Sequence, residues 1–329
     1  MENKVSIVIC TYNGADYIRE QLDSIINQTY PIFEIIIQDD CSKDNTVYIL
    51  EEYTKKYDYI HLFINEKQKG INGNFFSAMS RANGDYIAIS DQDDIWEPDK
   101  LENQINSIGD KWLSLGFSRI FSADNSNTYY DSRIPNTKAE RLIYVSGIGG
   151  HTFLLKKEML SYILPSTPII YDHAIIIVAA SNNMISFVDK VIVNHREHRT
   201  SATYTAPVMK RGANNKSIFN IVKSVIRTLK FYFELRNTIK VHFLDIVNLL
   251  NYLPDWESKA MALKIAKCQS EKGIISYLKL TYYCIKSRRY LFYTEEKDGM
   301  LTFLRAVYFP VSCSDYFRYL SKSYHKYNV

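Results

Sequence analysis

Short apolar runs alternate with helical patterns along the first hundred residues of this chain. Four runs of β-branched and other apolar residues predict strands at Val5–Cys10, Phe33–Ile37, Ile60–Ile64 and Tyr86–Ser90. Between the first two runs, apolar residues recur at helical spacing, at Ile18, Leu22, Ile25 and Ile26. Continuous apolar strands that alternate with helices are typical of a mostly parallel sheet covered by helices on both faces.

The second part of the chain has a looser pattern. A polar segment at 124–141 is interpreted as a loop, and order returns with a strand at 151–155, a helix from Asp172 and a strand at 186–193. Beyond Tyr204, apolar residues follow helical spacing at 218–235 and 239–253. We therefore predict an α/β catalytic domain over residues 1–204, followed by a mainly helical region over residues 205–329.

The two parts of the chain differ in the sign of their net charge. Residues 1–204 contain 19 Lys and Arg against 27 Asp and Glu, whereas residues 205–329 contain 21 against 9. An acidic part that could hold cations therefore precedes a basic, aromatic-rich part that could face anions such as phospholipid headgroups. Apolar residues make up 46% of the chain and charged residues 23%, as in a folded protein.

Cysteine usage and apolar run lengths bear on the location of the protein. The five cysteines form no Cys-x-x-Cys pair, and their odd number disfavours a complete set of disulfides. The apolar run after Lys4 is too short for a signal peptide, and the run at Ala174–Ala180 is too short to span a membrane. These features predict a cytoplasmic protein that is at most peripheral on the inner face of a membrane.

The sequence Asp91-Gln92-Asp93-Asp94 places three carboxylates directly after a predicted buried strand. Like charges this close repel one another unless a cation lies among them. Carboxylate oxygens favour Mg²⁺ or Mn²⁺, so a metal site is one interpretation, and a solvated acidic turn that caps the next helix is the other.

Two further loops follow predicted strands at the same edge of the sheet, where ligands bind in open α/β folds. Asp39 and Asp40 could accept hydrogen bonds from a base or ribose, or could cap the next helix. Thr11, Tyr12 and Asn13 form the other loop. Neither a Gly-x-Gly-x-x-Gly nor a P-loop pattern is present, so dinucleotide wrapping and P-loop phosphate binding are not supported.

Asp172, Arg196 and His198 are candidates farther along the chain. Asp172 precedes an apolar helix, where it could cap the helix or act as a base. His195 and His198 lack the spacing and the partner ligands of a structural zinc site, so contacts of Arg196 and His198 with a diphosphate are the preferred interpretation.

Four segments in this order resemble the family 2 glycosyltransferases, particularly their rhamnosyltransferase-like branch. They are VSIVICTYNGADYIREQLDSIINQTYP, EIIIQDDCSKD, GDYIAISDQDDIWEPDKL and NHREHRTSA, and they span about residues 4–204. The resemblance implies a GT-A fold, a nucleotide-diphosphate sugar donor, possible transfer of rhamnose or another hexose, and inversion at the anomeric carbon. It also implies a glycan or lipid-linked acceptor and a product in surface polysaccharide biosynthesis.

The resemblance also implies roles for particular residues. Thr11, Tyr12, Asn13, Asp39 and Asp40 would line the nucleotide pocket. Asp93 would ligate the divalent metal together with Asp91, which would also face the ribose or a metal-bound water. Asp94, Trp96 and His151 would shape the donor and acceptor side, Arg196 and His198 would face the diphosphate, and Asp172 would be the catalytic base. The chain departs from the branch after Asp172, where His173 and Ala174 stand in place of aromatic residues.

Other functions remain open from the sequence. A sugar nucleotidyltransferase also needs clustered carboxylates, but the Gly-rich loop expected of it is absent. A non-catalytic glycan-binding scaffold could share the fold. The basic helices after residue 204 could rest on an anionic membrane or form a packed domain with a basic surface, and no nucleic-acid recognition motif accompanies their charge.

Overall fold

The computed structural model describes residues 3–122, 128–144, 148–164, 166–198, 218–312 and 314, which form two compact units. The first unit comprises Met1–Ser132, Gly147–Ala179 and Asn183–Glu197, and the second comprises Arg133–Ser146, Ala180–Asn182 and His198–Val329. The units interleave, because the chain passes from one to the other more than once. The predicted boundary at residues 204 and 205 lies outside the described residues.

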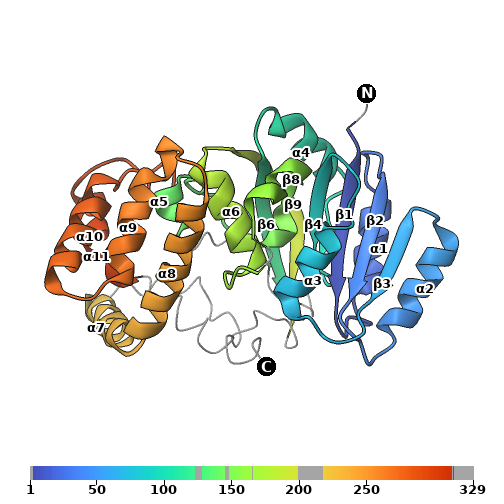
Figure 1. The fold of residues 1–329 in the computed structure, drawn as a ribbon, viewed down its shortest axis with the longest axis horizontal. Helices are drawn as coiled ribbons and strands as arrows, with labels where there is room; N and C mark the ends of the chain where they lie inside the picture. Colours follow the sequence, from blue (N-terminus) through green and yellow to red (C-terminus); the bar gives the residue numbers. More distant parts are fainter. Residues whose placement is uncertain are drawn as a thin grey trace. The chain divides into compact units, whose positions relative to one another are not determined.

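The first unit is built on one sheet with helices packed against it (Figure 1). Its strands are β1 (Val5–Thr11), β2 (Glu34–Asp39), β3 (Ile60–Ile64), β4 (Tyr86–Ser90), β5 (Ile95–Trp96), β6 (Leu113–Ser122), β7 (Thr128–Tyr130), β8 (Leu154–Lys156) and β9 (Ile185–Glu197). Its helices are α1 (Ile18–Ile26), α2 (Thr46–Lys56), α3 (Gly70–Met79), α4 (Lys100–Ile108), the 3₁₀ turns η1 (Gly150–Thr152) and η2 (Lys157–Tyr162), and α6 (Tyr171–Ser181), whose last two residues belong to the second unit.

Strand order in the sheet is β3-β2-β1-β4-β8-β6-β9-β5, and β7 pairs with β6. Strands β1 to β4 are mutually parallel, as the alternating pattern predicted. Strand β8 joins β4 and β6 in antiparallel pairing, and β5 is a two-residue antiparallel edge on β9. The predicted α/β sheet flanked by helices is therefore confirmed, with antiparallel strands added beyond β4.

The interior of the first unit follows from its apolar pattern. Every residue of β2 is buried, as is most of β1, which is typical of strands covered on both faces. Helix α1 packs into this core through Ile18, Leu22 and Ile25. Helix α3 lies against β1 and β2, and α4 lies against β6 and β9 (Figure 1). The helices thereby fix the loops that leave the ends of the central strands.

Helix α6 is apolar on all sides, and each residue from Ala174 to Ala180 has no exposed surface. A helix with this composition belongs inside a protein or a membrane. Among the residues that the structure describes, no helix combines the length and the apolar character that crossing a bilayer requires.

The second unit is mainly helical, as predicted (Figure 1). Its elements are α5 (Ala139–Leu142), α7 (Ile218–Glu234), α8 (Arg236–Tyr252), η3 (Glu257–Lys259), α9 (Ala260–Ser270), α10 (Ile274–Lys286) and α11 (Met300–Ser312). Short β7 and α5 lie in the part of the chain that the sequence pattern had left as a loop. The buried ammonium group of Lys259 caps the C-terminal end of α8. It donates to the carbonyls of Leu250 and Leu253, each at 2.7 Å.

Candidate active site

Three loops that follow β1, β2 and β4 are bonded to one another at one edge of the sheet. The loop amide of Tyr12 donates to Oε1 of Gln92 at 2.8 Å, and Nε2 of Gln92 donates back to the Tyr12 carbonyl at 3.1 Å. The Asn13 amide donates to Oγ of Ser42, and the Lys43 amide donates to Oδ1 of Asn13. The prediction that these loops lie side by side is confirmed.

Backbone conformation allows this close approach. Asn13 and Cys41 both adopt the left-handed region, with φ of 49° and 64°, and the Gly14 amide donates to Oγ1 of Thr46. A Cβ added at Gly14 would lie 2.2 Å from Oε1 of Gln92, which is closer than any real contact. A side chain at position 14 would therefore displace the end of the Gln92 side chain, whose hydrogen bonds with Tyr12 join the first loop to the acidic loop.

Asp39 lies at the end of β2 with no exposed surface. Its carboxylate accepts hydrogen bonds from Oγ1 of Thr11 at 2.8 Å and from both the amide and the hydroxyl of Ser42, at 2.8 and 2.6 Å. Two of the five residues predicted to line a nucleotide pocket, Thr11 and Asp39, thus contact each other directly. In this arrangement Asp39 holds the loop after β2 against the end of β1.

Asp40 orders the start of α3. Its carboxylate accepts hydrogen bonds from the amides of Lys69 and Gly70, at 2.7 and 3.0 Å, and from Nδ2 of Asn65 at 2.7 Å. Anionic groups are favourable at a helix N-terminus, where backbone N–H groups lack partners. The paired aspartates therefore each stabilise a different loop at the same edge.

The three carboxylates after β4 differ in their exposure. Asp91 and Asp93 are half-buried, whereas Asp94 has no exposed surface. Burial raises the pKa of Asp91, and the nearby positive charge of His195 lowers it in part. Asp91 and Asp93 remain accessible to a ligand, and Asp94 faces the protein interior.

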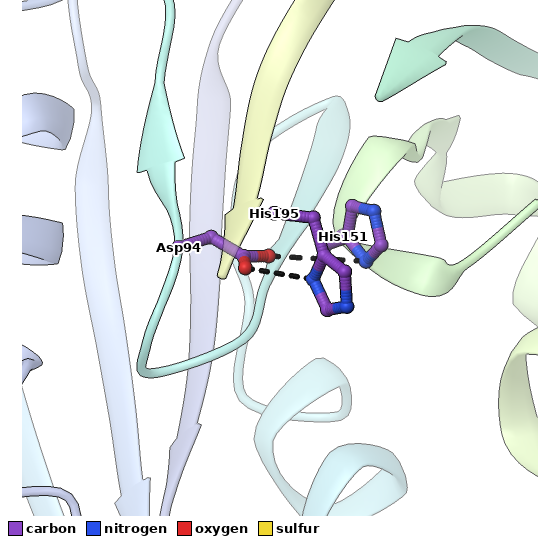
Figure 2. A group of neighbouring side chains, drawn as sticks. All are labelled: Asp94, His151 and His195. Carbon is purple, nitrogen blue, oxygen red and sulfur yellow. Dashed lines mark hydrogen bonds and ion pairs between the residues drawn. The ribbon is translucent and has the colours of Figure 1, made fainter. Parts of the chain in front are cut away.

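Asp94 meets two histidines from distant parts of the chain (Figure 2). Its Oδ1 lies 2.8 Å from Nδ1 of His195 in β9 and accepts the amide of Arg196 at 3.1 Å. Nδ1 of His151 in η1 lies 3.8 Å from Oδ2 of Asp94 and 3.5 Å from Oδ2 of Asp91. The two imidazole rings are parallel, with centroids 4.6 Å apart. One carboxylate thus lies beside a stacked pair of histidines.

These two histidines have opposite electrostatic surroundings. Burial lowers the pKa of His151 to about 4. Burial would also lower the pKa of His195, but the charge of Asp94 and its hydrogen bond outweigh burial and raise this pKa to about 9. At neutral pH the structure therefore favours one charged imidazole, paired with Asp94, and one neutral imidazole beside it.

Asp172 is fixed at the beginning of α6. The Tyr171 amide donates to Oδ1 of Asn72 at 2.8 Å, and the Tyr171 ring stacks on Phe75 with centroids 4.0 Å apart. The amide of His173 donates to the Asp172 carboxylate at 2.7 Å. Helix α3 therefore holds the residue before Asp172, and the first turn of α6 orients its carboxylate.

The pKa of Asp172 is raised to about 6. Desolvation is the main cause, and the negative charge of Asp91 adds to it, while the His173 amide opposes both. Asp91 is therefore near enough to Asp172 for its charge to act on this carboxylate. A carboxylate with a raised pKa that is still ionised at neutral pH has the properties of a general base.

Arg196 is buried beneath the acidic loop. Its Nε donates to the Asp93 carbonyl at 3.0 Å, and its guanidinium forms an ion pair with Glu20. The same group lies over the rings of Phe121 and Tyr17, at 4.8 and 5.1 Å. Arg196 therefore joins β9 to the backbone of the acidic loop, whatever ligand the loop holds.

Trp96 and Lys100 lie in the core rather than on an open surface. Trp96 is 2% exposed, and the ammonium group of Lys100 lies 4.2 Å from the centroid of its ring. Lys100 donates to Gln104 at 2.7 Å, and burial lowers its pKa to about 7. His198, the predicted partner of Arg196, is buried and belongs to the second unit.

Comparison with known proteins decides the family. The model of "Glycosyl transferase family 2" matches residues 6–172, which is more than half of the chain. The chain belongs to this family. The match covers the loops after β1, β2 and β4, both carboxylates Asp91 and Asp93, and Asp172 at its end.

Curated family 2 glycosyltransferases resemble this chain over part of their length. A UDP-Glc:alpha-D-GlcNAc-diphosphoundecaprenol beta-1,3-glucosyltransferase of Escherichia coli is 32% identical over 48% of this chain and 62% of its own length. A dTDP-rhamnosyl transferase of Shigella flexneri is 36% identical over 46% of this chain and 55% of its own length. The match thus spans little more than half the length of these relatives.

Solved structures show the same fold at low sequence identity. The S. aureus TarS fragment 1–349 in complex with UDP-GlcNAc has a TM-score of 0.55 and 19% identity, over 98% of this chain and 92% of that one. A mannosyltransferase of Pyrobaculum calidifontis in complex with GDP-Man and Mn²⁺ has a TM-score of 0.50 and 16% identity, over 96% and 87% of the two chains. These matches assign the GT-A type fold to this family 2 glycosyltransferase.

The residues of this glycosyltransferase fit a divalent cation. Asp91 and Asp93 offer accessible carboxylate oxygens, which Mg²⁺ and Mn²⁺ prefer. In the same loop, Oδ2 of Asp94 is buried without a hydrogen-bond donor.

Sequence reasoning missed the pairing of His151 and His195. His151 was predicted at the acceptor side, and His195 was considered only together with His198. No local pattern could have joined them, because η1 and β9 meet only in the folded chain. The one available signal was that His151 was itself a candidate site residue and that His195 directly precedes another, Arg196.

Proposed function

We propose that this chain transfers a sugar from a nucleoside-diphosphate donor to a hydroxyl group of a glycan or lipid-linked acceptor, with inversion at the anomeric carbon. The observation that carries this proposal is the set of three loops bonded to one another at one edge of the sheet, one of which carries the accessible carboxylates of Asp91 and Asp93. Surface polysaccharide biosynthesis is the proposed setting, and its support is the Escherichia coli relative, which is named for transfer of glucose to a GlcNAc-diphosphoundecaprenol acceptor.

The donor side consists of the three bonded loops. Thr11, Tyr12 and Asn13 contribute a loop that Gln92 and Ser42 fix, and Tyr12 is exposed enough to contact a base. Asp39 has no exposed surface, so its proposed role is to hold the loop after β2 in the conformation that receives the nucleotide, and Asp40 holds the start of α3 in the same way. A preformed pocket lowers the entropic cost of binding the donor.

Asp91 and Asp93 would hold the divalent cation. When bound, the cation would stabilise the negative charge that develops on the diphosphate leaving group. The protein's own contribution is to keep both carboxylates in place: Gln92 anchors the loop on one side, and Arg196 bonds the Asp93 carbonyl on the other. Arg196 is thus proposed to support the diphosphate side through the loop.

Asp172 would accept the proton of the acceptor hydroxyl as its oxygen attacks the anomeric carbon. The attack comes from the face opposite the diphosphate, so a single displacement inverts this centre. The bond to the diphosphate oxygen breaks as the new glycosidic bond forms, and the proton goes to the Asp172 carboxylate. The raised pKa of Asp172 suits this transfer near neutral pH.

Calorimetric titration with a panel of UDP-, GDP- and dTDP-sugars, with and without Mn²⁺, tests the donor site. We expect one nucleotide class to bind more tightly with Mn²⁺, and Asp93→Asn to abolish that dependence. Asp110→Asn is the matched control, because Asp110 is an exposed carboxylate of the same unit, away from the loop. Absence of binding to any donor by the folded protein would support the glycan-binding scaffold instead.

We also propose that the acceptor is reached at an anionic membrane surface. The support comes from α10, whose first turns expose Ile274, Ile275 and Leu278 to solvent at 76%, 67% and 62%. Lys272 and Lys279 flank this apolar stripe. Apolar side chains with lysines beside them are typical of helices that lie in a membrane interface.

A further inference from the structure

The strongest feature that the proposed reaction does not use is the cluster of Asp94, His151 and His195. These three residues come from the acidic loop, η1 and β9, and each turns a metal-ligating atom toward the others (Figure 2). The three atoms lie within 4.8 Å of one another. Asp94 has no exposed surface and His151 almost none, so the cluster lies inside the first unit.

Asp94 is only half satisfied by its protein partners. Its Oδ1 accepts from the His195 ring and from the Arg196 amide, whereas its Oδ2 is buried and accepts no hydrogen bond. A buried carboxylate oxygen without a donor is costly, and native structures usually satisfy such an atom with a proton, a water molecule or a cation. The unsatisfied oxygen lies on the side of Asp94 that faces His151.

His151 indicates which of these partners fits. Its Nε2 lies 3.1 Å from Oγ of Ser118, so this nitrogen is occupied, and Nδ1 faces Oδ2 of Asp94 at 3.8 Å and Oδ2 of Asp91 at 3.5 Å. Both distances are too long for hydrogen bonds. They are close to the separation of about 3.4 Å between two ligands of one tetrahedral cation at bond lengths near 2.1 Å.

The chemistry of the ligands selects the type of cation. Two imidazole nitrogens and one carboxylate oxygen suit Zn²⁺, Co²⁺ and related transition metals, whereas Mg²⁺ prefers oxygen ligands alone. Ser118 would hold the His151 ring from behind, as partners of metal-bound histidines commonly do. Three protein ligands leave one position for a water molecule.

We propose that Asp94, His151 and His195 form a second cation site that takes a borderline transition-metal ion, separate from the donor cation at Asp91 and Asp93. The ion joins the acidic loop to η1 and β9, three segments that are distant in the sequence. Its role is to fix the loop on which Asp91 and Asp93 stand. The ion replaces the proton that the His195 ring otherwise holds beside Asp94, because a metal-ligating imidazole is neutral. Its binding requires neither the nucleotide nor the sugar.

Titration of the full chain with Co²⁺, after removal of metals by a chelator and without nucleotide, tests this site. Co²⁺ bound by nitrogen and oxygen ligands in near-tetrahedral geometry absorbs visible light, and Zn²⁺ should displace it. We expect one Co²⁺ per chain, with affinity at least about 100-fold lower in His151→Gln and in His195→Gln. These variants are preferred to replacement of Asp94, because Asp94 is fully buried.

Two control variants make the result specific. His61→Gln removes an exposed histidine of β3, and Asp93→Asn removes a carboxylate of the donor site; both should keep the Co²⁺ spectrum and its stoichiometry. Thermal unfolding in metal-free buffer verifies that each variant folds. The proposal is overturned if no Co²⁺ binds, if both histidine variants bind it as the native chain does, or if Asp93→Asn loses it equally. The Co²⁺ titration contains no nucleotide, and the calorimetric titration measures donor binding directly, so failure of one proposal can be told from failure of the other.

Discussion

The surroundings of Asp172 distinguish it from the other acidic residues near the donor side. Most of those residues are tied to backbone amides or hydroxyl groups, as Asp39 and Asp40 are. Asp172 accepts the amides of His173 and of Gly150 in η1, yet desolvation with the field of Asp91 raises its pKa. Its position at the start of a buried helix, rather than its residue type, gives it the character of a base.

We predict that Asp172→Asn lowers the rate of sugar transfer by about 10²–10⁴-fold, because the amide cannot accept the proton of the acceptor. Donor affinity should change little, since Asp172 lies outside the three donor loops. In the native enzyme, kcat should rise with pH through about 6 as Asp172 loses its proton. A pH profile of kcat for the native chain, with Asp110→Asn as control, measures both effects. Transfer by Asp172→Asn at the native rate would remove Asp172 from the reaction.

Lys100 provides a prediction about stability. Burial lowers its pKa from 10.5 to about 7, so between these values the unfolded chain holds more protons at this residue than the folded one. The contribution of Lys100 therefore becomes more favourable as pH rises from 7 to 10.5, by about 1.4 kcal/mol per pH unit. Below pH 7 both states are protonated, and the cost of the buried charge is constant and largest.

Lys100→Met should therefore stabilise the protein near pH 7, and its advantage over the native chain should shrink toward pH 10. Urea unfolding at several pH values measures this difference, and Lys111→Met, on the surface near the end of the same helix, is the control. A difference that is independent of pH would show that Lys100 is solvated in the folded protein.

Among the elements, those with a local signature were predicted from the sequence. Strands β1 to β4 and helix α1 have continuous apolar runs or helical spacing, and the structure places them close to the predicted bounds. Strand β6 was not predicted, because Leu113–Ser122 mixes Gly and polar residues with apolar ones. Its pairing depends on β9, with bulges between Gly116 and Ser118, and such a register cannot be read from either strand alone.

The site residues also divide into those with a local sequence signal and those brought together by long-range pairing. The loops after β1, β2 and β4 were predicted to meet, because parallel strands place their carboxyl ends at one edge. Strand β9 brings His195 to Asp94, and η1 brings His151 there, through pairing and packing that no local pattern records. The burial of Asp94, which separates it from Asp91 and Asp93, likewise became visible only in the fold.

Helix α10 provides the test of membrane association. Replacing Ile274, Ile275 and Leu278 together by Ser should weaken binding to vesicles that contain phosphatidylglycerol by at least about tenfold, because three exposed apolar side chains no longer enter the interface. Co-sedimentation with vesicles measures this. The matched control replaces Val241 and Leu244 by Ser, and it should leave vesicle binding unchanged. Helix α8 exposes these two residues at 59% and 46%.

Charge should modulate the same binding. Lys272 and Lys279 beside the stripe favour anionic lipid, so binding should fall with added salt and be weaker to phosphatidylcholine alone. Equal binding by the α10 variant and the native chain would exclude this helix as the contact surface.

At the scale of the whole molecule, the two units do not correspond to two consecutive pieces of sequence. The second unit takes in Arg133–Ser146 and Ala180–Asn182 before the chain reaches His198. Tyr144, from the first of these segments, is buried and packs edge-on against Phe243 and Phe309, with ring centroids 5.0 and 4.6 Å away. The helices after residue 197 therefore depend on an aromatic ring that lies far earlier in the sequence.

A fragment that contains only residues 198–329 should consequently fail to unfold cooperatively, because it lacks Tyr144 and α5. In the full chain, Tyr144→Ala should reproduce the main part of this loss, at about 3 kcal/mol, as expected for removing a buried aromatic ring. Tyr144→Phe keeps the ring and should cost less than about 1 kcal/mol. Urea unfolding followed by circular dichroism compares the fragment, both variants and the native chain. Cooperative unfolding of the fragment would show instead that the helices after residue 197 form a complete core, and that residues 133–146 join it only as a surface addition.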